Sequence, residues 1–393
     1  MLSGIRILDL SRVLSGPFCS RMLADMGAEV IKVESHDGDP MRLYPPFKGG
    51  YSSYFTQWNV GKKSISVDFR QQAGVNLVKK LAIECDVVLQ NFRTGLLEKM
   101  GLGYDVLKEL NPDIILCSIS GFGQTGPETG RLAYTDIVQA YSGLDYIAGK
   151  MSGPDADPPG FPVSFADTYA SLNACVCILA ALYHRGMTGQ GQAIDISMLD
   201  CLLASNDSTL QQYLFSDGAW DKPLGIWRPP LKMKDGHMGV ALLLQFERTV
   251  NAIGMPELLD DKRFKTMADQ VVNIEAFLEI VGEWAKDVTI DEASALFDKY
   301  EIPHARVHSN REILESDVVR ERKMVVDLDF PKTGRLQVIN TPFKFSSVPT
   351  GPRYAPRELG QDTRSILSHL LKMSDDEIDC LVESGVIKEP GGK

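Results

Sequence analysis

Residues 4–34, GIRILDLSRVLSGPFCSRMLADMGAEVIKVE, carry the pattern that decides the fold. The apolar run at 5–10 predicts a short strand, and Gly16-Pro17 opens a helix that stops at Gly27. Proline inside a helix start and glycine just past its end is the order that helix termini favour. A second apolar run at 29–34 predicts the next strand. The stretch is therefore a strand–helix–strand unit of the kind that builds parallel sheets.

The same alternation continues over the first half of the chain. Apolar runs predict further strands at 63–68, 86–90, 114–119 and 193–196, with helices near 72–83, 95–100, 104–110, 167–185 and 198–214. Apolar strands joined by helical crossovers form parallel sheets with helices on their faces. We therefore expect an α/β fold whose large, Rossmann-like domain contains a parallel sheet.

The second half of the chain differs in character. A proline-rich linker at 223–230 precedes a smaller α+β unit, with a hairpin at Asp235-Gly236 and helices near 247–254, 274–286 and 291–300. A second proline-rich stretch at 342–356 leads to a helix near 363–372. These features predict a large domain at 1–222, a small domain with its linker at 223–335, and a return to the large domain at 336–393.

The composition excludes several classes of protein. The 393 residues include 41 Lys and Arg against 52 Asp and Glu, a formal net charge of −11, which argues against nucleic acid and anionic membranes as partners. No run of about 18 apolar residues predicts a membrane-spanning helix, and the N-terminus lacks the pattern of a signal peptide. The seven Cys are scattered, mostly in apolar runs, as expected of reduced thiols. We therefore expect a cytoplasmic protein.

One glycine-rich motif and the histidines are candidates for a cofactor or metal site. Residues 121–126, GFGQTG, match the G-x-G-x-x-G dinucleotide fingerprint. The next residues, PETG at 127–130, predict a continuing loop, whereas the fingerprint needs a helix to begin inside the motif. The six His are dispersed and no Cys-x-x-Cys pair occurs. The sequence thus predicts neither an NAD site nor a metal site.

Asp167 stands directly before an apolar helical stretch, and this position has two explanations. An aspartate there can cap the helix. The same position also favours the ionised form of a carboxylate, and an ionised carboxylate can attack an activated acyl carbon. Composition and spacing do not decide between the capping role and the nucleophilic role.

Several longer motifs resemble those of the family III CoA-transferases, in the same order and over nearly the whole chain. They are the opening at 4–34, GDPMR at 38–42, KKSI at 62–65, NFR at 91–93, SGFGQTGP at 120–127, TGQGQ at 188–192 and LGQDT at 359–363. The resemblance also explains the false match to the dinucleotide fingerprint, because the glycine loop is one of these motifs.

The resemblance implies an enzyme that moves CoA from an acyl-CoA thioester to a free carboxylic acid. It implies that Asp167 is the acyl-accepting aspartate, which forms a mixed anhydride and then an aspartyl-CoA thioester. Glycine loops suit the N–H donors that this chemistry needs near a developing oxyanion. Coenzyme A is the implied cofactor and substrate, and the residues implied to contact it are Val13, Leu14, Ser15, Arg42, Val67, Arg70, Asn91, Phe92, Arg93, Lys99 and Tyr134. The four cations among them suit the phosphates of CoA.

The resemblance also implies a homodimer of two interlocked chains. A 2-methylacyl-CoA racemase on the same fold is the alternative function, but racemases of this kind use a His–Asp pair and the corresponding residues 133–136, AYTD, contain no His. Leu14 stands where the formyl-CoA enzymes carry Gln, which argues against a formyl or oxalate substrate. The acyl group stays open, and candidates for its pocket are Gln57, Trp58, Tyr141, Trp227 and Phe246.

Overall fold

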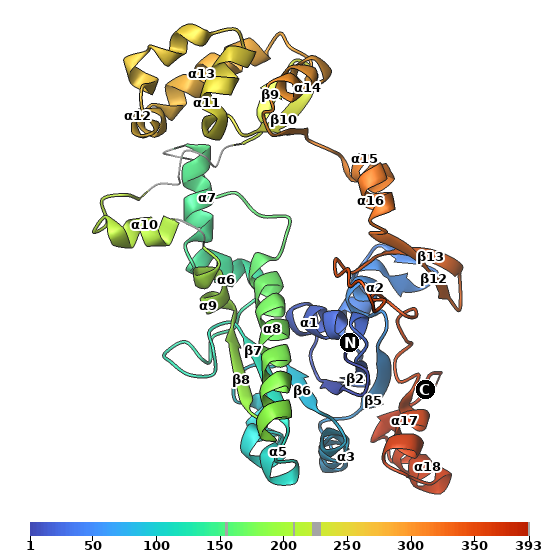
Figure 1. The fold of residues 1–393 in the computed structure, drawn as a ribbon. Helices are drawn as coiled ribbons and strands as arrows, with labels where there is room; N and C mark the ends of the chain where they lie inside the picture. Colours follow the sequence, from blue (N-terminus) through green and yellow to red (C-terminus); the bar gives the residue numbers. More distant parts are fainter. Residues whose placement is uncertain (154–155, 207–208, 222–228, 392–393) are drawn as a thin grey trace. The chain divides into compact units, whose positions relative to one another are not determined.

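The computed structural model describes residues 1–153, 156–206, 209–221 and 229–391. These residues form two compact units (Figure 1). The large unit comprises Met1–Leu144, Phe161–Ser205 and Val318–Lys393, and the small unit comprises Asp145–Gly160 and Asn206–Asp317.

A seven-stranded sheet forms the centre of the large unit, in the order β14-β5-β2-β1-β6-β7-β8. All neighbours are parallel except β14, which runs antiparallel to β5. The strands are β1 (Arg6–Asp9), β2 (Glu29–Glu34), β5 (Lys63–Val67), β6 (Val87–Gln90), β7 (Ile115–Ser120), β8 (Ala193–Ser197) and β14 (Ile387–Lys388). The six strands expected from the sequence are confirmed to within a residue at each end.

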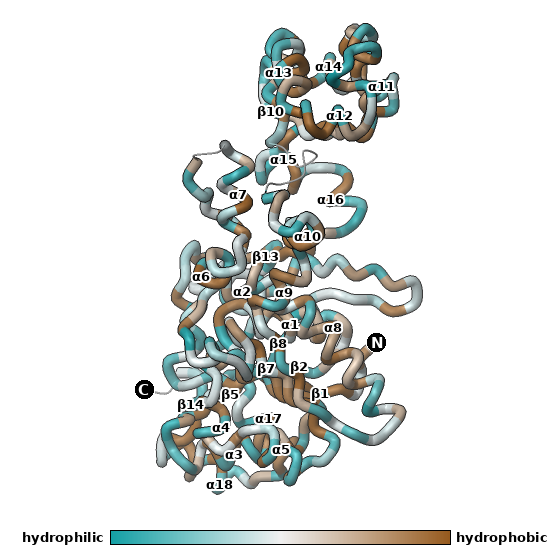
Figure 2. The backbone as a smooth tube through the Cα atoms, turned by 90° about the vertical axis from the view of Figure 1, so that its left-hand side faces the viewer, coloured by the Kyte–Doolittle hydropathy of each residue, from teal (hydrophilic) through white to brown (hydrophobic). Residues whose placement is uncertain are grey.

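Helices cover both faces of this sheet (Figure 1). One hydrophobic core joins it to α1 (Ser15–Asp25), α8 (Phe165–Thr188) and α9 (Met198–Ala204), and a second core joins it to α3 (Gln72–Ile83), α5 (Tyr104–Leu110) and α17 (Thr363–Leu370). Ile7 faces the first core and Leu8 the second, as the two-residue period of a strand requires. Both sides of the strands are therefore apolar, and β1, β2 and β7 appear brown in Figure 2.

The remaining elements of the large unit are short. They are η1 (Pro40–Leu43), α2 (Ser53–Asn59), α4 (Leu96–Lys99), α6 (Thr135–Tyr141), α16 (Asp317–Glu321, at the border of the unit), α18 (Asp375–Glu383) and the hairpins β3 (Phe47–Lys48) with β4 (Tyr51–Ser52) and β12 (Val325–Phe330) with β13 (Gly334–Ile339).

The order of the strands creates a switch point beside β1. The chain adds β2 and β5 on one side of β1 and then places β6, β7 and β8 on the other. The loops that leave the carboxyl ends of β1 and β6 therefore diverge. In open parallel sheets, this crevice is the usual place for a ligand.

α8 is the crossover helix between β7 and β8, and with 24 residues it extends beyond the expected 167–185. By length and composition, it is the single helix among the described residues that could cross a bilayer. One of its faces packs against α1 and the sheet through Ala166, Ala170, Ala174 and Ile178. A crossover helix runs opposite to its strands, so the first turn of α8 lies at the carboxyl edge of the sheet.

The single helix expected at 198–214 is wrong, because two helices occupy this stretch. α9 ends at Ala204, and α10 (Thr209–Phe215) follows after a break. The Asn206 side-chain oxygen accepts the Leu210 N–H at 3.2 Å, the kind of local bond that starts a new helix. Apolar spacing does not report such a bond.

The small unit is an α+β unit, as expected. Its sheet contains β9 (Leu231–Met233), β10 (Gly236–Val240) and β11 (His304–Arg306), which confirms the hairpin at Asp235-Gly236. The rings of Phe246, Phe264 and Phe277 pack together in its core at centroid distances of 4.9–5.7 Å. Its helices are α7 (Leu144–Ser152), α10, α11 (Phe246–Ala252), α12 (Met267–Val272), α13 (Ile274–Ala285), α14 (Ile290–Lys299) and α15 (Asn310–Glu315).

The domain boundaries expected at 223 and 336 differ from those of the structure. The chain leaves the large unit at 205 and returns at 318, and residues 145–160 also belong to the small unit. The β12–β13 hairpin belongs to the large unit because Phe330 and Val338 share a core with Val60 and Ala355. Packing of the hairpin therefore sets the return to the large unit at residue 318. The proline-rich stretch at 342–356, from which the return was predicted, lies inside that unit.

Candidate functional site

The loop that connects β1 to α1 at the switch point has an uncommon backbone conformation. Val13 has a φ of 69°, in the left-handed region that β-branched residues rarely occupy. Such a residue costs on the order of 1–3 kcal/mol and persists where surrounding contacts hold it. The groups that bind this loop are therefore part of the site.

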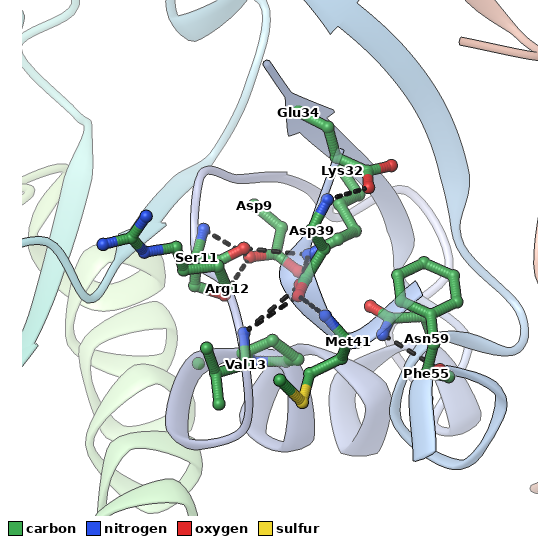
Figure 3. Close-up of polar contacts among 12 residues, drawn as sticks. Asp9, Ser11, Arg12, Val13, Lys32, Glu34, Asp39, Met41, Phe55 and Asn59 are labelled. Atoms are coloured by element: carbon green, nitrogen blue, oxygen red, sulfur yellow. Dashed lines mark hydrogen bonds and ion pairs between the residues drawn. The ribbon is translucent and has the colours of Figure 1, made fainter. Parts of the chain in front are cut away.

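A buried ion pair holds one side of the loop (Figure 3). The Asp39 carboxylate accepts the Val13 N–H, at distances of 3.2 and 3.4 Å from the nitrogen to its two oxygens. It also accepts the Met41 N–H and pairs with Lys32 Nζ at 3.0 Å. Lys32 in turn donates to the Ser11 carbonyl at 2.8 Å. The pair thus binds the loop at residues 11 and 13.

A second buried ion pair holds the two ends of the loop. Asp9, the last residue of β1, accepts the Ser11 N–H at 3.0 Å and pairs with Lys62 Nζ at 3.1 Å. Lys62 also donates to the Pro17 carbonyl at 3.0 Å, in the first turn of α1. Burial alone would raise the pKa of Asp9, but Lys62 and Lys32 outweigh it and hold that pKa at about 2. Asp9 is therefore charged at neutral pH.

Asn91, the first residue after β6, holds the loop from across the switch point. Its side-chain oxygen accepts the Arg12 N–H at 2.9 Å, and its amide donates to the Arg12 carbonyl at 2.8 Å. The same amide lies 3.1 Å from the Ser15 hydroxyl oxygen. The Asn91 side chain, expected to contact CoA, is thus engaged in fixing the loop.

Asp167 lies in the first turn of α8, beside Ser15. The helix begins at Phe165 with Ser164 as its N-cap, so Asp167 is the third helical residue and the capping explanation is wrong. Its half-buried carboxylate receives hydrogen bonds from the hydroxyl and the backbone N–H of Ser15. Burial raises the pKa of Asp167 to about 6, and these two bonds limit the rise. The Ser171 hydroxyl lies 2.7 Å from the carbonyl oxygens of both Ser15 and Asp167 and links the two helices.

Tyr54 of α2, which the sequence did not single out, lies within electrostatic range of this carboxylate. Burial raises the pKa of its hydroxyl to about 12, and the negative charge of Asp167 adds to the rise. Its ring contacts those of Tyr44 and Trp58, at centroid distances of 5.6 and 6.5 Å. The Tyr54 phenol is therefore neutral over the pH range in which Asp167 ionises. Its signal in the sequence is an aromatic cluster without regular spacing.

The residues expected to contact CoA lie where five neighbouring strands end or beyond those ends. The residues after β1 are Val13, Leu14 and Ser15, and the one after β2 is Arg42. The last residue of β5 is Val67, and Arg70 comes shortly after it. The residues after β6 are Asn91, Phe92, Arg93 and Lys99, and the one after β7 is Tyr134. Because parallel strands end together, the sheet brings those at or just after a strand to one edge, whereas Arg42, Lys99 and Tyr134 lie further along the connecting segments.

Some of these side chains are already occupied or buried. Leu14 and Val67 are buried, which leaves their backbone to contact a ligand. The Arg42 guanidinium donates to both carboxylate oxygens of Glu34 at 2.7 Å, so its charge is matched within the protein. Phe92 packs edge-to-face on another ring beside the second core.

Four of the remaining side chains face solvent. Arg70 is 80% exposed and pairs with Asp68 at 2.8 Å. Arg93 is exposed, and its Nε donates to the carbonyl of residue 130 at 3.1 Å. Lys99 at the end of α4 and Tyr134 before α6 are also exposed. These are the charges and the ring that a ligand at the edge can reach.

The glycine motif at 121–126 lies in a loop that runs from β7 to α6 without a helix start, as expected. The Gln124 N–H donates to the Asp195 carboxylate at 2.9 Å, and the Thr94 hydroxyl donates to the Gly123 carbonyl at 3.3 Å. The motif therefore borders the same edge of the sheet.

The remaining candidates fall in different places. Trp58 contacts Tyr54, whereas Phe246 is buried in the core of the small unit, and Trp227 lies outside the described residues. Across the described ranges, no three His, Cys, Asp or Glu side chains cluster as metal ligands would.

Comparison with known proteins identifies relatives of the chain. A sequence model of CoA-transferase family III matches residues 2–363. The chain is 36% identical to succinyl-CoA:glutarate CoA-transferase of Mus musculus, over 99% of this chain and 90% of that protein. It is 33% identical to succinyl-CoA–D-citramalate CoA-transferase of Chloroflexus aurantiacus, over 98% of both. A solved CAIB/BAIF family protein from Brucella suis has 32% identity and a TM-score of 0.81, over 94% of this chain and 98% of that one. Transferase relatives do not favour the racemase alternative.

Proposed function

The chain belongs to CoA-transferase family III and is an enzyme of that type, and we propose that it transfers CoA between carboxylic acids through a covalent intermediate on Asp167. The observation that carries the proposal is the environment of this carboxylate. It is half-buried, receives hydrogen bonds from Ser15, and pairs with no cation in the part of the chain that the structure describes. A carboxylate in this state keeps a lone pair for attack on a carbonyl carbon.

In the proposed cycle, an Asp167 oxygen attacks the thioester carbon of the acyl-CoA donor. The C–S bond breaks, CoA leaves as a thiolate, and a mixed anhydride joins Asp167 to the acyl group. The thiolate then attacks the Asp167 carbonyl carbon, which releases the donor acid as a carboxylate and leaves an aspartyl-CoA thioester.

The second half of the cycle reverses these steps with the acceptor. The acceptor carboxylate attacks the aspartyl-CoA thioester, displaces CoA thiolate and forms a second anhydride. The thiolate attacks the acceptor's acyl carbon, so that acyl-CoA leaves and the Asp167 carboxylate is restored. No net proton is taken up or released.

Each attack develops negative charge on a carbonyl oxygen, which nearby donors stabilise. The hydroxyl and N–H of Ser15 are the donors that support this role. The glycine loop at 121–126 is a second source of N–H groups at the same edge. In the proposal, CoA lies along this edge with its phosphates near Arg70, Arg93 and Lys99.

We propose succinyl-CoA as the donor and a dicarboxylic acid as the acceptor. The support is the pair of curated relatives, which are named for succinyl-CoA with glutarate and with D-citramalate. A panel of acceptors that compares dicarboxylic with monocarboxylic acids tests this proposal, and a preference for monocarboxylic acids would contradict it.

We further propose that the enzyme is an interlocked homodimer. The outward face of α8 carries Leu172, Val176, Tyr183 and Met187, which are 40–74% exposed. Their spacing of four and seven residues places them on one side of the helix. An apolar stripe of this kind suits burial against a second copy. Sedimentation velocity should give twice the chain mass of 43.4 kDa, and a monomer at micromolar concentration would exclude the dimer.

The decisive experiment traps the covalent intermediate. The protein is incubated with succinyl-CoA without acceptor and then treated with hydroxylamine, which converts an activated aspartyl group to a hydroxamate. Mass spectrometry of the peptides should locate the hydroxamate at Asp167. Asp167→Asn should lose both the label and CoA transfer.

Asp200→Asn is the matched control. Asp200 is another first-turn aspartate, at the start of α9, and its side chain is exposed. This variant should keep the label and the transfer rate. Full transfer activity in Asp167→Asn would reject the proposal.

A further inference from the structure

We propose that Asp39 is a positioning residue, which holds the Val13 N–H and thereby sets the two donors of Ser15 against the Asp167 carboxylate. The inference rests on the proposed role of Asp167. Asp39 itself touches neither Ser15 nor Asp167 by any hydrogen bond in the described chain; it acts through the backbone of the loop (Figure 3).

The first step of the argument is the conformation of Val13. At a φ of 69°, a β-branched residue is strained, and an unheld loop would relax toward negative φ. Both Asp39 oxygens face the Val13 N–H, and the Lys32 ammonium pairs with this carboxylate at 3.0 Å. A rotation at Val13 would displace Ser15, two residues further along the chain.

The second step is the way in which the network flanks Ser15. Asp39 holds residue 13 on one side, and Lys62, paired with Asp9, holds the carbonyl of residue 17 on the other. Asn91 adds a bond to the Ser15 hydroxyl. Ser15 therefore has little freedom, although no charged group of the network contacts it directly.

The third step links this position to chemistry. The two bonds from Ser15 favour the ionised form of Asp167, which is the attacking form. Tyr54 of α2 lies within electrostatic range of Asp167, and it stays neutral throughout the working range because its pKa is about 12. A displaced Ser15 would thus weaken attack and move the ionisation of Asp167 to higher pH.

The test uses Asp39→Asn, which keeps the shape of the side chain and removes its charge. The rate of Asp167 acylation by succinyl-CoA, measured in single turnovers with hydroxylamine trapping, should fall by about 10–100-fold, because small displacements near a reacting group have effects of this size. The KM for succinyl-CoA should change less than about threefold. The acid limb of kcat/KM against pH should shift upward by at least about half a unit.

Asp25→Asn is the matched control for loss of a buried ion pair. Asp25 lies in α1 and pairs with Arg21 at 2.7 Å, with both side chains at most 6% exposed, but it does not touch the loop at 10–14. This variant removes the ion pair and should keep the acylation rate within about twofold and the acid limb in place.

Val13→Gly provides a rescue, since glycine adopts positive φ without strain. Added to Asp39→Asn, it should raise the acylation rate at least about threefold above that of Asp39→Asn alone, because a relaxed glycine needs no clamp. A purely structural role for Asp39 predicts no rescue. If Asp39→Asn does not fold, Asp39→Glu keeps the charge beside Lys32 but displaces the carboxylate by one methylene, and should reduce acylation with the same shift of the acid limb.

Two results would overturn the inference. One is a wild-type acylation rate and acid limb in Asp39→Asn, or in Asp39→Glu where the former does not fold. The other is an equal loss and shift in Asp25→Asn. Failure of the proposed function has a different signature, because wild-type protein would then form no hydroxamate at Asp167 at all.

Discussion

Two parts of the same sheet edge use charge in opposite ways. Around the loop from residue 10 to 14, charges are paired with one another and buried: the side chains of Lys32, Asp39, Lys62 and Asp9 are at most 2% exposed. Along the outer part of the edge, Arg70 is 80% exposed and remains in contact with solvent. The first group is committed to holding backbone, whereas the second is available to a ligand.

The difference indicates that buried and exposed charges have separate roles at this edge. Buried charges cost free energy to desolvate, and removing one partner leaves the other without compensation. Such pairs suit a geometry that must not change, here the approach of Ser15 to Asp167. Exposed charges contribute little to stability, so they can exchange water and neighbours for phosphates.

The largest expected effect concerns Asp167, the carboxylate that the buried charges help to position. Asp167→Asn should lower turnover by at least about 1000-fold, because the nucleophile is removed. It should also raise the free energy of unfolding at pH 7.5 by about 1–2 kcal/mol, since a charge in a half-buried place is removed. Urea denaturation measures the second effect.

The pH dependence of this stabilisation has a defined sign. The pKa of Asp167 is raised to about 6 in the folded protein, so between pH 4 and 6 the folded state keeps a proton that the unfolded state has lost. Wild-type stability therefore falls as pH rises through this window. The advantage of Asp167→Asn should grow from pH 4 to pH 7.5, and a less stable variant at pH 7.5 would contradict the assignment.

The next effect compares one buried and one exposed ion pair directly. Lys62→Met leaves Asp9 charged and buried, and should reduce the free energy of unfolding by about 3–5 kcal/mol. Arg70→Met removes the partner of Asp68 at the exposed part of the edge and should leave the free energy of unfolding nearly unchanged. Urea titrations of both variants measure the difference, and equal losses would break the comparison.

A third prediction concerns the pH dependence of the reaction. Attack requires ionised Asp167, and its pKa is raised to about 6 by burial. Below that pH, kcat/KM for succinyl-CoA should fall about tenfold per unit, and above it the rate should level off. Rates measured from pH 4.5 to 8 test this prediction; a plateau that extends to pH 4.5 would show that the reacting carboxylate is not the raised one.

The smallest effect concerns the exposed part. Arg93→Ala should raise the KM for succinyl-CoA by about three- to tenfold and leave kcat within about twofold, because it removes one phosphate contact proposed for CoA. The increase should shrink at high salt. Arg335→Ala removes an exposed cation from β13, a strand that contributes none of the residues proposed to contact CoA, and should leave KM unchanged. An equal effect of both variants would indicate general charge attraction.

The sequence predicts the strands and helices of the large unit better than it predicts the contacts of the candidate site. The strands at 29–34 and 87–90 follow from apolar runs, and α1 follows from Gly16-Pro17, because local spacing determines these elements. The β12–β13 hairpin was missed, since its identity depends on packing against Val60 and Ala355.

The site depends on contacts between distant residues. Asp167 was selected by resemblance, and the first-turn position alone left its role undecided. The contact of Asp39 with Val13 joins residues 26 positions apart, and Ser15 and Asp167 belong to two different helices. The spacing of apolar residues does not predict such contacts, because they form only once the sheet has brought the segments together.

The antiparallel strand β14 has a consequence for biosynthesis. It pairs with β5 through Ile387 and Val67, so the ribosome adds this partner about 320 residues later, on the order of 15–60 s at ordinary elongation rates. During that interval, the outer edge of β5 presents unpaired N–H and carbonyl groups, which are a template for aggregation. The outer edge of β5 therefore stays without its antiparallel partner until residue 387 has been added.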